Sequence, residues 1–315
     1  MKKLLAVAVA FVLAAPAFAA AKAKTAGQTP ARPSVEFIVI ESDEYAAGKV
    51  DMPMAHAVAN FLGGDAKVTP VSYQQAKQNP EYANMDMSYL PLYLLKTTPQ
   101  YREKLTQHIA VGQVLERGEY LVFPHLSNSG VYQDKVANPG VLEIFVMSQC
   151  PFGAMAENLV IDAMKAGKLP ADKVIKLRYI VSYNEQNGFQ SLHGAGEWEE
   201  NVRQLLIAKY YPAKLWKYLE IRNKDYSSSR WDKAMEEAGI NIKKITKKFD
   251  TEGIELLKKE AAYSDEYGIN ASPSFLYEGK EKLDFGSVSQ KPGFEFLNPS
   301  NANRGGGQAA PVGSC

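Results

Sequence analysis

The pattern of hydrophobic and polar positions is most distinct over residues 141–150. A short, mostly apolar run here predicts a buried strand, which ends at Ser148-Gln149 and leads directly to Cys150. The residues after the cysteine predict a helix, because apolar residues recur at helical spacing: Met155, Leu159, Val160 and Ala163. We therefore expect Cys150 to lie where a strand passes into a helix.

The first part of the chain carries the pattern of a β-α-β unit. Residues 34–40 and 66–73 predict strands, and residues 53–62 predict a helix that Gly63-Gly64 closes. Pro91 stands near the head of the next apolar run, where a missing N–H is harmless to a strand. The apolar runs after the β-α-β unit cover residues 89–95, 109–115 and 120–123.

A second set of elements follows the helix after Cys150. Residues 173–181 alternate as a strand, and a long, mostly helical insertion follows over about 188–266. After the insertion, Ser272-Pro273 leads into another strand, and residues 283–288 can pair as the last strand. Within the insertion we expect helices at residues 199–208, 215–219, 231–238, 242–249 and 253–263.

Composition divides the chain further. A charged start, an apolar stretch and the small-x-small pattern Ala17-Phe18-Ala19 predict a signal peptide over residues 1–19, cleaved after Ala19, and export to the periplasm. The remaining segments are a solvated leader (20–33), a first domain (34–134), a linker (135–140), a second domain (141–297) and a disordered tail (298–315).

Overall composition excludes several classes of protein. The formal net charge is +1, so there is no electrostatic bias toward nucleic acid or anionic lipid. After the signal peptide no apolar run reaches about 18 residues, so we expect no membrane span. Two cysteines are too few for a scaffold built on disulfides. No pattern indicates a cofactor or a bound metal.

Cys150 is the candidate nucleophile. The first turn of a helix offers unpaired N–H groups and a partial positive charge, and both stabilise a thiolate over a thiol. Pro151 suits this turn, because the N–H that proline lacks would have no partner there. The alternative is a buried, inert cysteine.

The order of elements in the second domain resembles the DsbA-like branch of the thioredoxin superfamily over residues 141–297. The match is most specific where the cysteine turn is combined with the segment from Gly268 to Phe275, which contains Ser272-Pro273. A cis peptide bond is expected between Ser272 and Pro273. The resemblance implies a catalytic role for Cys150 together with Pro273, and substrate contacts from Pro151, Phe152, Gly153 and Ser272.

The first domain resembles a degenerate thioredoxin fold with Pro91 as its cis-proline. Its counterpart of the active-site turn is Glu41–Tyr45, which contains no thiol, so no redox chemistry is expected there. The alternative is a generic α/β domain. The expected fold class is therefore α/β, with two tandem thioredoxin-like domains, the second of them DsbA-like with a helical insertion.

The start of the insertion is similar to the signature of the gamma-interferon-inducible lysosomal thiol reductase family. His193, Glu197 and Asn201 match this signature, whereas Ser191 and Trp198 replace two of the family's cysteines. On a helix the three matching residues would line one stripe. Their alternative roles are a packing cluster, a metal site, for which His193 and Glu197 supply too few ligands, and proton transfer near the thiol.

Thioredoxin-like enzymes carry a second cysteine three residues after the first, and this chain has Gly153 there. The release of a substrate bound to Cys150 then needs another thiol. The alternatives are a small-molecule thiol, a second protein, or Cys315, which a flexible tail of 17 residues with a span of about 20–25 Å can bring to Cys150. Cys315 can also be a stray terminal cysteine that is prone to form dimers.

These features favour a periplasmic thiol-disulfide oxidoreductase or isomerase that acts through Cys150 on the thiols or disulfides of exported proteins. A redox partner or a small thiol would complete the reaction. The alternative is a non-catalytic periplasmic binding or scaffold protein built on degenerate thioredoxin folds. An acidic, accessible Cys150 thiol distinguishes the first function from the second.

Overall fold

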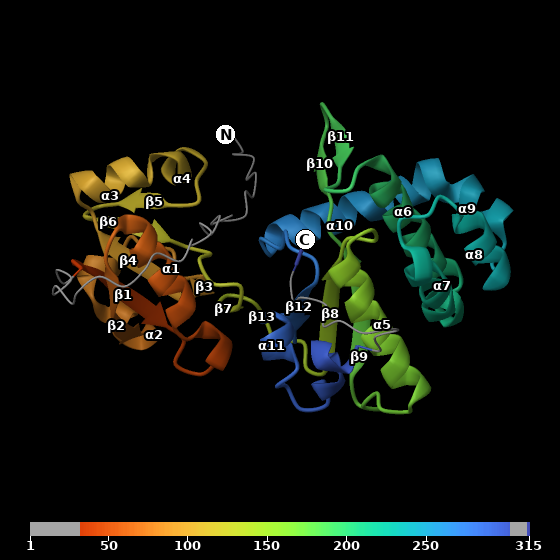
Figure 1. Cartoon of the computed structure of the whole chain (residues 1–315), viewed down its shortest axis with the longest axis horizontal. Coiled ribbons are helices and arrows are strands. Elements are labelled where there is room, and N and C mark those ends of the chain that lie inside the picture. Colours follow the sequence, from red (N-terminus) through yellow and green to blue (C-terminus); the bar gives the residue numbers. More distant parts are fainter. Residues whose placement is uncertain (1–31, 303–313) are drawn as a thin grey trace, which may run out of the picture. The chain divides into compact units, whose positions relative to one another are not determined.

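The computed structural model of the chain describes residues 32–302 and 314–315 (Figure 1). The chain divides into two compact units, residues 1–134 (unit 1) and 135–315 (unit 2), and both are mixed α/β. The expected signal peptide and nearly all of the expected leader lie outside the described residues. Each unit is described by itself below.

The sheet of unit 1 is built around β1, which pairs with β2 in parallel and with β4 in antiparallel orientation. The helix α1 (Met52–Leu62) connects β1 to β2, and it begins at Asp51, whose side chain accepts the N–H of Met54. It ends at Gly63, whose left-handed φ of 93° suits glycine. The strand order is β2-β1-β4-β6-β5, with bounds Ser34–Glu41 (β1), Asp65–Ser72 (β2), Leu92–Lys96 (β4), Leu115–Arg117 (β5) and Tyr120–Phe123 (β6).

Both faces of this sheet are covered by apolar residues. On one face the alternating residues Val35, Phe37 and Val39 of β1 pack with the buried side of α1. On the other face Ile40 packs with Leu92 and further apolar residues. The strand and helix predicted over residues 34–62 are confirmed, because alternation and helical spacing both match the burial.

The rest of unit 1 departs more from the pattern. The apolar run 109–115 forms no single element, because its first residues belong to a helix and its last residue begins β5. The bond Leu90-Pro91 is cis, as expected, and it separates β4 from a short strand that pairs with β7. The other elements of unit 1 are α2 (Tyr73–Gln78), α3 (Pro99–Lys104), α4 (Thr106–Ala110), β3 (Tyr89–Leu90), β7 (Gly130–Tyr132), η1 (Ala46–Gly48) and η2 (Pro80–Tyr82).

The sheet of unit 2 repeats the same relation between strands. The central β8 (Val141–Val146) pairs with β9 (Val174–Tyr179) in parallel and with β12 (Ser274–Tyr277) in antiparallel orientation. β13 (Glu281–Leu283) pairs with β12 in antiparallel orientation. Every residue of β8 is buried, as its apolar run predicts. The helix α5 (Pro151–Lys165) follows β8, and Gly167 comes directly after its last turn.

Residues 283–288 do not form the single strand that we expected. β13 ends at Leu283, and the side chain of Asp284 then accepts the N–H of Ser287 and so starts the short helix α11 (Phe285–Val288). Asp is a strong helix N-cap, and here its capping bond ends the extended run.

The insertion is helical, as predicted, but a hairpin that was not expected precedes its first helix. β10 (Ser182–Asn184) and β11 (Gly188–Gln190) are each three residues long, which is too short to show strand alternation. In Figure 1 the helices α6 to α9 gather on the α5 side of the unit 2 sheet. The remaining elements are α6 (Ala195–Tyr210), η3 (Pro212–Lys214), α7 (Leu215–Arg222), η4 (Asn223–Asp225), α8 (Trp231–Glu237), α9 (Ile242–Lys248), η5 (Phe249–Gly253) and α10 (Ile254–Glu266).

The end of the expected leader and the start of the expected tail differ from the prediction. Arg32 Nη1 donates to Asn60 Oδ1 at 2.7 Å, so the last part of the leader contacts unit 1. After η6 (Glu295–Leu297), the side chain of Asn298 caps η7 (Pro299–Asn301), and Pro299 is buried. The tail therefore does not start at residue 298, because its first residues are held by local capping and burial. Residues 303–313 of the expected tail lie outside the described residues.

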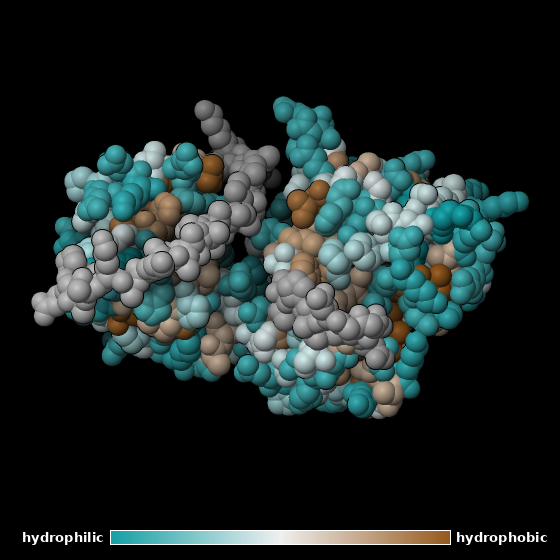
Figure 2. Space-filling view, in the orientation of Figure 1, coloured by the Kyte–Doolittle hydropathy of each residue, from teal (hydrophilic) through white to brown (hydrophobic). Residues whose placement is uncertain are grey.

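Within residues 32–302 and 314–315, no helix combines the length and the apolar character that crossing a bilayer requires. The face shown in Figure 2 is mostly hydrophilic, and its hydrophobic residues stand in small separate groups. Among the described residues of unit 2, the large apolar side chains that are exposed are Val136, Met164, Val174 and Leu192.

Candidate functional site

Cys150 lies at the start of α5, as predicted. It has extended backbone angles, and its Sγ accepts the N–H of Gly153 at 3.4 Å, so the sulfur takes the place of a helix N-cap side chain. Pro151 follows in the first turn. The helix N-terminus presents N–H groups and a partial positive charge to the sulfur, and both favour a thiolate once the sulfur is reduced.

The segment before β12 lies against this sulfur. The peptide bond Ser272-Pro273 is cis, which confirms the prediction. The carbonyl oxygen of Ser272 is 3.4 Å from Cys150 Sγ. The Ser272 hydroxyl accepts the N–H of Met147 at 2.9 Å and is buried, so Ser272 is anchored to the chain segment that precedes the cysteine.

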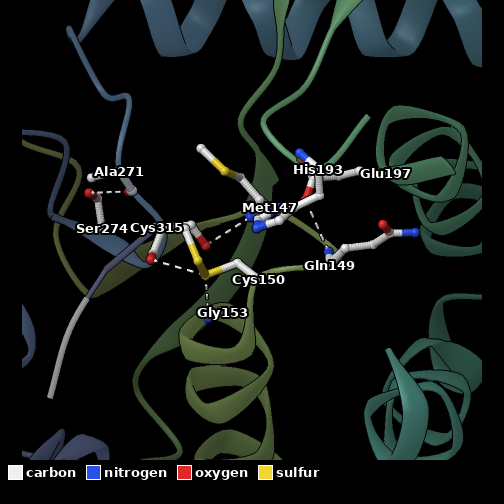
Figure 3. Close-up of a disulfide and its surroundings, with 10 residues drawn as sticks. Met147, Gln149, Cys150, Gly153, His193, Glu197, Ala271, Ser274 and Cys315 are labelled. Carbon is white, nitrogen blue, oxygen red and sulfur yellow. Dashed lines mark hydrogen bonds and ion pairs between the residues drawn. A yellow bond between two sulfur atoms is a disulfide. The ribbon is translucent and has the colours of Figure 1, made fainter. Parts of the chain in front are cut away.

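The structure joins Cys150 to Cys315 in a disulfide (Figure 3). The two residues are 165 positions apart in the sequence, and their Cα atoms are 6.1 Å apart. The backbone of Cys315 also pairs with that of Ser272: Cys315 N donates to Ser272 O at 2.8 Å, and Ser272 N donates to Cys315 O at 3.2 Å. In this state Cys150 is 0% exposed. A disulfide sulfur carries no hydrogen, so Cys150 can donate to the Ser272 oxygen only in its thiol form.

Gly153 occupies the place of the second cysteine in a Cys-x-x-Cys motif, and the structure leaves no room for a side chain there. A Cβ at residue 153 would lie 2.8 Å from Ser272 Oγ and 3.1 Å from the Met147 carbonyl oxygen. The Ser272 hydroxyl cannot move away freely, because it holds the Met147 N–H. Glycine at this position is therefore a packing requirement of the site.

His193, Glu197 and Asn201 come together beside the turn that leads to Cys150. The Glu197 carboxylate is fully buried, accepts the N–H of Gln149 at 3.2 Å and lies 2.5 Å from His193 Nδ1. The Asn201 side chain accepts the N–H of Ser148 at 3.3 Å. These contacts fasten the insertion to the Cys150 turn. The three residues do not share one helix, because α6 begins at Ala195 and His193 lies in the preceding loop.

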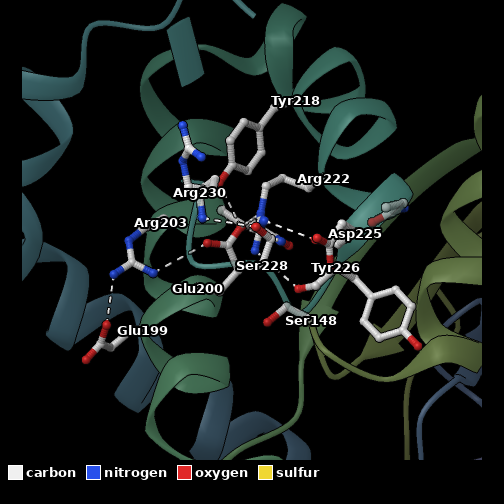
Figure 4. A network of polar contacts seen from close by, with 12 residues as sticks. Ser148, Glu199, Glu200, Arg203, Tyr218, Arg222, Asp225, Tyr226, Ser228 and Arg230 are labelled. Carbon is white, nitrogen blue, oxygen red and sulfur yellow. Dashed lines mark hydrogen bonds and ion pairs between the residues drawn. The ribbon is translucent and has the colours of Figure 1, made fainter. Parts of the chain in front are cut away.

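α6 is held in place by a buried polar network that sequence reasoning missed (Figure 4). The carboxylate of Glu200, one residue before Asn201, accepts the hydroxyl of Tyr218 at 2.7 Å and Arg222 Nε at 3.2 Å. Arg203 Nη1 also approaches it at 3.4 Å. Because Tyr218 and Arg222 belong to α7, the network fixes the rotation of α6 and with it the direction of Glu197. The spacing of Glu200, Arg203 and Gln204 along one helical face was the available signal.

Glu157 is a second buried carboxylate near the site. It lies in α5, two turns after Cys150, and Asn223 Nδ2 donates to its Oε2 at 2.8 Å. Burial raises the pKa of Glu157 to about 7, and the hydrogen bond from Asn223, which lowers the pKa, offsets only part of this rise. Its other oxygen and the hydroxyl of Tyr179 are both buried without a hydrogen-bond partner among the described residues.

The remaining predicted site residues lie at the rim. Pro151 is exposed and Phe152 is half-buried in the first turn of α5. Within the part of the chain that the structure describes, no three His, Cys, Asp or Glu side chains are grouped as metal ligands would be.

Comparison with known proteins gives matches among solved structures alone. No protein-family model matches the chain, and no curated protein matches it. Among solved structures, it is similar to the DsbA disulfide interchange protein of Klebsiella pneumoniae (18% identity, 54% of this chain and 89% of that chain, TM-score 0.37). It is also similar to BdbD of Bacillus subtilis (13%, 53% and 88%, TM-score 0.39) and to the oxidoreductase NmDsbA1 of N. meningitidis (12%, 55% and 87%, TM-score 0.38).

Proposed function

We propose that unit 2 is a thioredoxin-like domain of the DsbA type that exchanges thiols and disulfides with exported proteins, with Cys150 as its nucleophile. The observation that carries the proposal is the position of Cys150 Sγ, which caps α5 and lies 3.4 Å from the carbonyl oxygen of Ser272, the residue before cis-Pro273. Thiol-disulfide exchange needs a stabilised thiolate, and the Cys150 sulfur lies next to the backbone of Ser272, an edge that can pair with a substrate strand.

The residues around Cys150 have separate roles in this proposal. The N–H of Gly153 and the helix N-terminus stabilise the thiolate that attacks a substrate disulfide. The N–H and C=O of Ser272 pair with the extended substrate backbone, and Pro273 fixes the direction of that edge. Pro151 and Phe152, at the rim, contact the substrate chain. Glu197 and Asn201 hold the turn that carries the cysteine.

We also propose that the two units are tandem thioredoxin-like domains, residues 34–134 and 141–297 with a linker at 135–140. In support, the central strand of each unit has one parallel neighbour and one antiparallel neighbour that follows a cis-proline. Unit 1 contains no cysteine, so its role is binding rather than exchange. The signal-peptide pattern of residues 1–19 supports a periplasmic location for this activity.

The proposal is tested by the pH dependence of Cys150 alkylation in a reduced Cys315→Ser variant, which leaves one thiol in the chain. We expect an apparent thiol pKa clearly below about 8.5, the ordinary value for cysteine. The matched control is Cys150→Ser, in which Cys315 should alkylate with an ordinary pKa. An apparent pKa of about 8.5 or higher for Cys150 would instead support the non-catalytic scaffold.

A further inference from the structure

We propose that Cys315 is the resolving thiol of Cys150, and that it is delivered through the same backbone subsite at Ser272 that a substrate strand uses. The inference rests on the proposed function and deepens it. It assigns the ligand class of the subsite, an extended polypeptide segment with a cysteine, and it makes Cys315 a catalytic residue because its sulfur bonds to the reacting sulfur.

The contacts of Cys315 are those of a strand residue. Cys315 and Ser272 exchange two hydrogen bonds, N–H to C=O in both directions, at 2.8 and 3.2 Å. This reciprocal pair is the bonding of two directly opposed residues in an antiparallel ladder. The contacts use backbone groups and a sulfur, which every cysteine in an extended peptide possesses. The subsite therefore accepts a substrate cysteine in the same way.

Unit 1 contains a fixed version of this subsite. The residue before its cis-proline is Leu90, and it pairs in antiparallel register with Val131 of β7. A strand of the unit itself thus occupies the edge next to Pro91, just as Cys315 occupies the edge next to Pro273. In unit 2 the occupant is held to Cys150 by a disulfide, so reduction can release it.

The chain offers no other resolving thiol. Cys150 and Cys315 are its two cysteines. Residue 153 cannot supply one without rearrangement, because a Cβ there would meet Ser272 Oγ at 2.8 Å and the Met147 carbonyl oxygen at 3.1 Å. The packing that excludes a neighbouring thiol leaves Cys315 as the internal partner.

The proposed cycle balances as two exchange steps. The Cys150 thiolate attacks a substrate disulfide, a Cys150–substrate disulfide forms, and the second substrate sulfur leaves as a thiolate. The Cys315 thiolate then attacks Cys150 Sγ, the Cys150–Cys315 disulfide forms, and the first substrate sulfur leaves as a thiolate. Two electrons pass from the cysteine pair to the substrate disulfide. The reverse sequence oxidises a substrate dithiol.

Sharing one subsite imposes an order on these steps. Ser272 has one backbone N–H and one backbone C=O, and Cys315 bonds to both when the Cys150–Cys315 disulfide is formed. A substrate strand must therefore leave Ser272 before or as Cys315 enters, and the closed disulfide blocks the site, with Cys150 fully buried.

The test uses the reduced full chain and a short synthetic peptide whose single cysteine is activated as a mixed disulfide with 2-thiopyridine. Intact-protein mass spectrometry follows the Cys150–peptide adduct in wild type, Cys315→Ser and the control Ser314→Ala. We expect the adduct to convert to the Cys150–Cys315 disulfide in wild type and Ser314→Ala. In Cys315→Ser it should persist at least about tenfold longer, because a tethered thiol acts at high effective concentration.

Equal persistence in wild type and Cys315→Ser would overturn the resolving role and leave the proposed function standing. An unreactive Cys150 in all three proteins would overturn both. The shared subsite has its own readout, hydrogen exchange at the Ser272 amide. That amide should be protected in oxidised wild type, lose protection in reduced Cys315→Ser and regain it in the peptide adduct of Cys315→Ser. An adduct without this protection would show that substrate and Cys315 do not share Ser272.

Discussion

The two units place their central strands in the same relation to their neighbours but continue differently after that strand. In unit 2, residues 147–150 lead from β8 straight into α5, and the N-cap is a cysteine. In unit 1, residues 42–51 separate β1 from α1, and the N-cap is the carboxylate-bearing Asp51. The strand arrangement is therefore shared, but unit 2 is the unit that places a sulfur at the first turn of a helix directly after the central strand.

The position that corresponds to Cys150 in unit 1 is Tyr45. In unit 2, Phe145 pairs with the residue after cis-Pro273, and Cys150 follows Phe145 by five residues. In unit 1, Ile40 pairs with the residue after cis-Pro91, and Tyr45 follows Ile40 by five residues. Tyr45 precedes η1, which is a turn of three residues. So short a turn provides little of the helix charge that acts on Cys150.

The units also differ in what they bury. Within residues 32–134 the buried polar side chains are the uncharged Ser42 and Ser127, whereas unit 2 buries several carboxylates and two arginines. Unit 1 thus buries almost entirely apolar side chains, whereas unit 2 also buries paired charges, which are costly to separate. Unfolding of unit 2 can be followed separately, because all three tryptophans, Trp198, Trp216 and Trp231, belong to it.

The largest expected effect comes from moving the thiol between units. A Tyr45→Cys, Cys150→Ser, Cys315→Ser variant keeps one thiol, now in unit 1. We expect its exchange with an activated-disulfide peptide to fall to the rate of an ordinary cysteine, with an alkylation pKa of about 8.5, while Cys315→Ser alone stays faster at neutral pH. A thiol at residue 45 as acidic as Cys150 would remove the distinction between the two turns.

The next largest effect is on stability. Glu200→Ala leaves Arg222 and Tyr218 buried without their shared acceptor, and breaking a buried pair in this way costs about 3–5 kcal/mol. Urea unfolding followed by tryptophan fluorescence should register this loss in unit 2. The control is Glu255→Ala in the same unit, whose pair with Lys258 is exposed, so a much smaller loss is expected. Equal losses in the two variants would contradict the claim that the buried Glu200 network stabilises unit 2.

A smaller, pH-dependent effect is expected at Glu157. Its pKa is about 7 in the folded protein against 4.5 for the free side chain, so the folded state holds this proton more tightly. Its contribution to the free energy of unfolding is therefore retained at low pH and falls as pH rises from about 4.5 to about 7, by about 3 kcal/mol.

Glu157→Gln removes this dependence. Relative to wild type, the variant should gain about 3 kcal/mol more stability at pH about 8 than at pH about 4, in urea unfolding followed by tryptophan fluorescence. The same stability difference at both pH values would mean that Glu157 does not change protonation on unfolding.

Sequence reasoning succeeded where one local pattern determines the structure. The apolar run before Cys150 and the helical spacing after it predict a strand that passes into a helix, and the proline after Ser272 predicts the cis bond; both are found. The short strands β10 and β11 were missed, because three residues carry no measurable alternation. Residues 285–288 form a short capped helix, although their apolar content favoured a strand. Residues 299–301 form a capped helical turn, although their composition favoured a disordered tail.

The sequence pattern alone does not predict contacts between distant segments. The buried partners of Glu200 lie 18 and 22 residues away, on another helix. The sequence left three possible resolving thiols open, and the pairing of Cys315 with both Cys150 and Ser272 required the tertiary structure. The clash that keeps Gly153 small is likewise made by atoms of Ser272 and Met147, which no spacing rule connects.

The most direct test of the account is a two-sided exchange experiment under anaerobic conditions with a model polypeptide that contains one disulfide. Reduced wild-type protein is mixed with the oxidised polypeptide, oxidised protein is mixed with the reduced polypeptide, and mass spectrometry counts the disulfides in both molecules. We predict that both mixtures reach the same equilibrium, with one polypeptide disulfide gained for each Cys150–Cys315 disulfide lost. Mixtures that stay at their starting states, while dithiothreitol readily reduces the Cys150–Cys315 disulfide, would contradict the claim that this pair exchanges with polypeptide thiols.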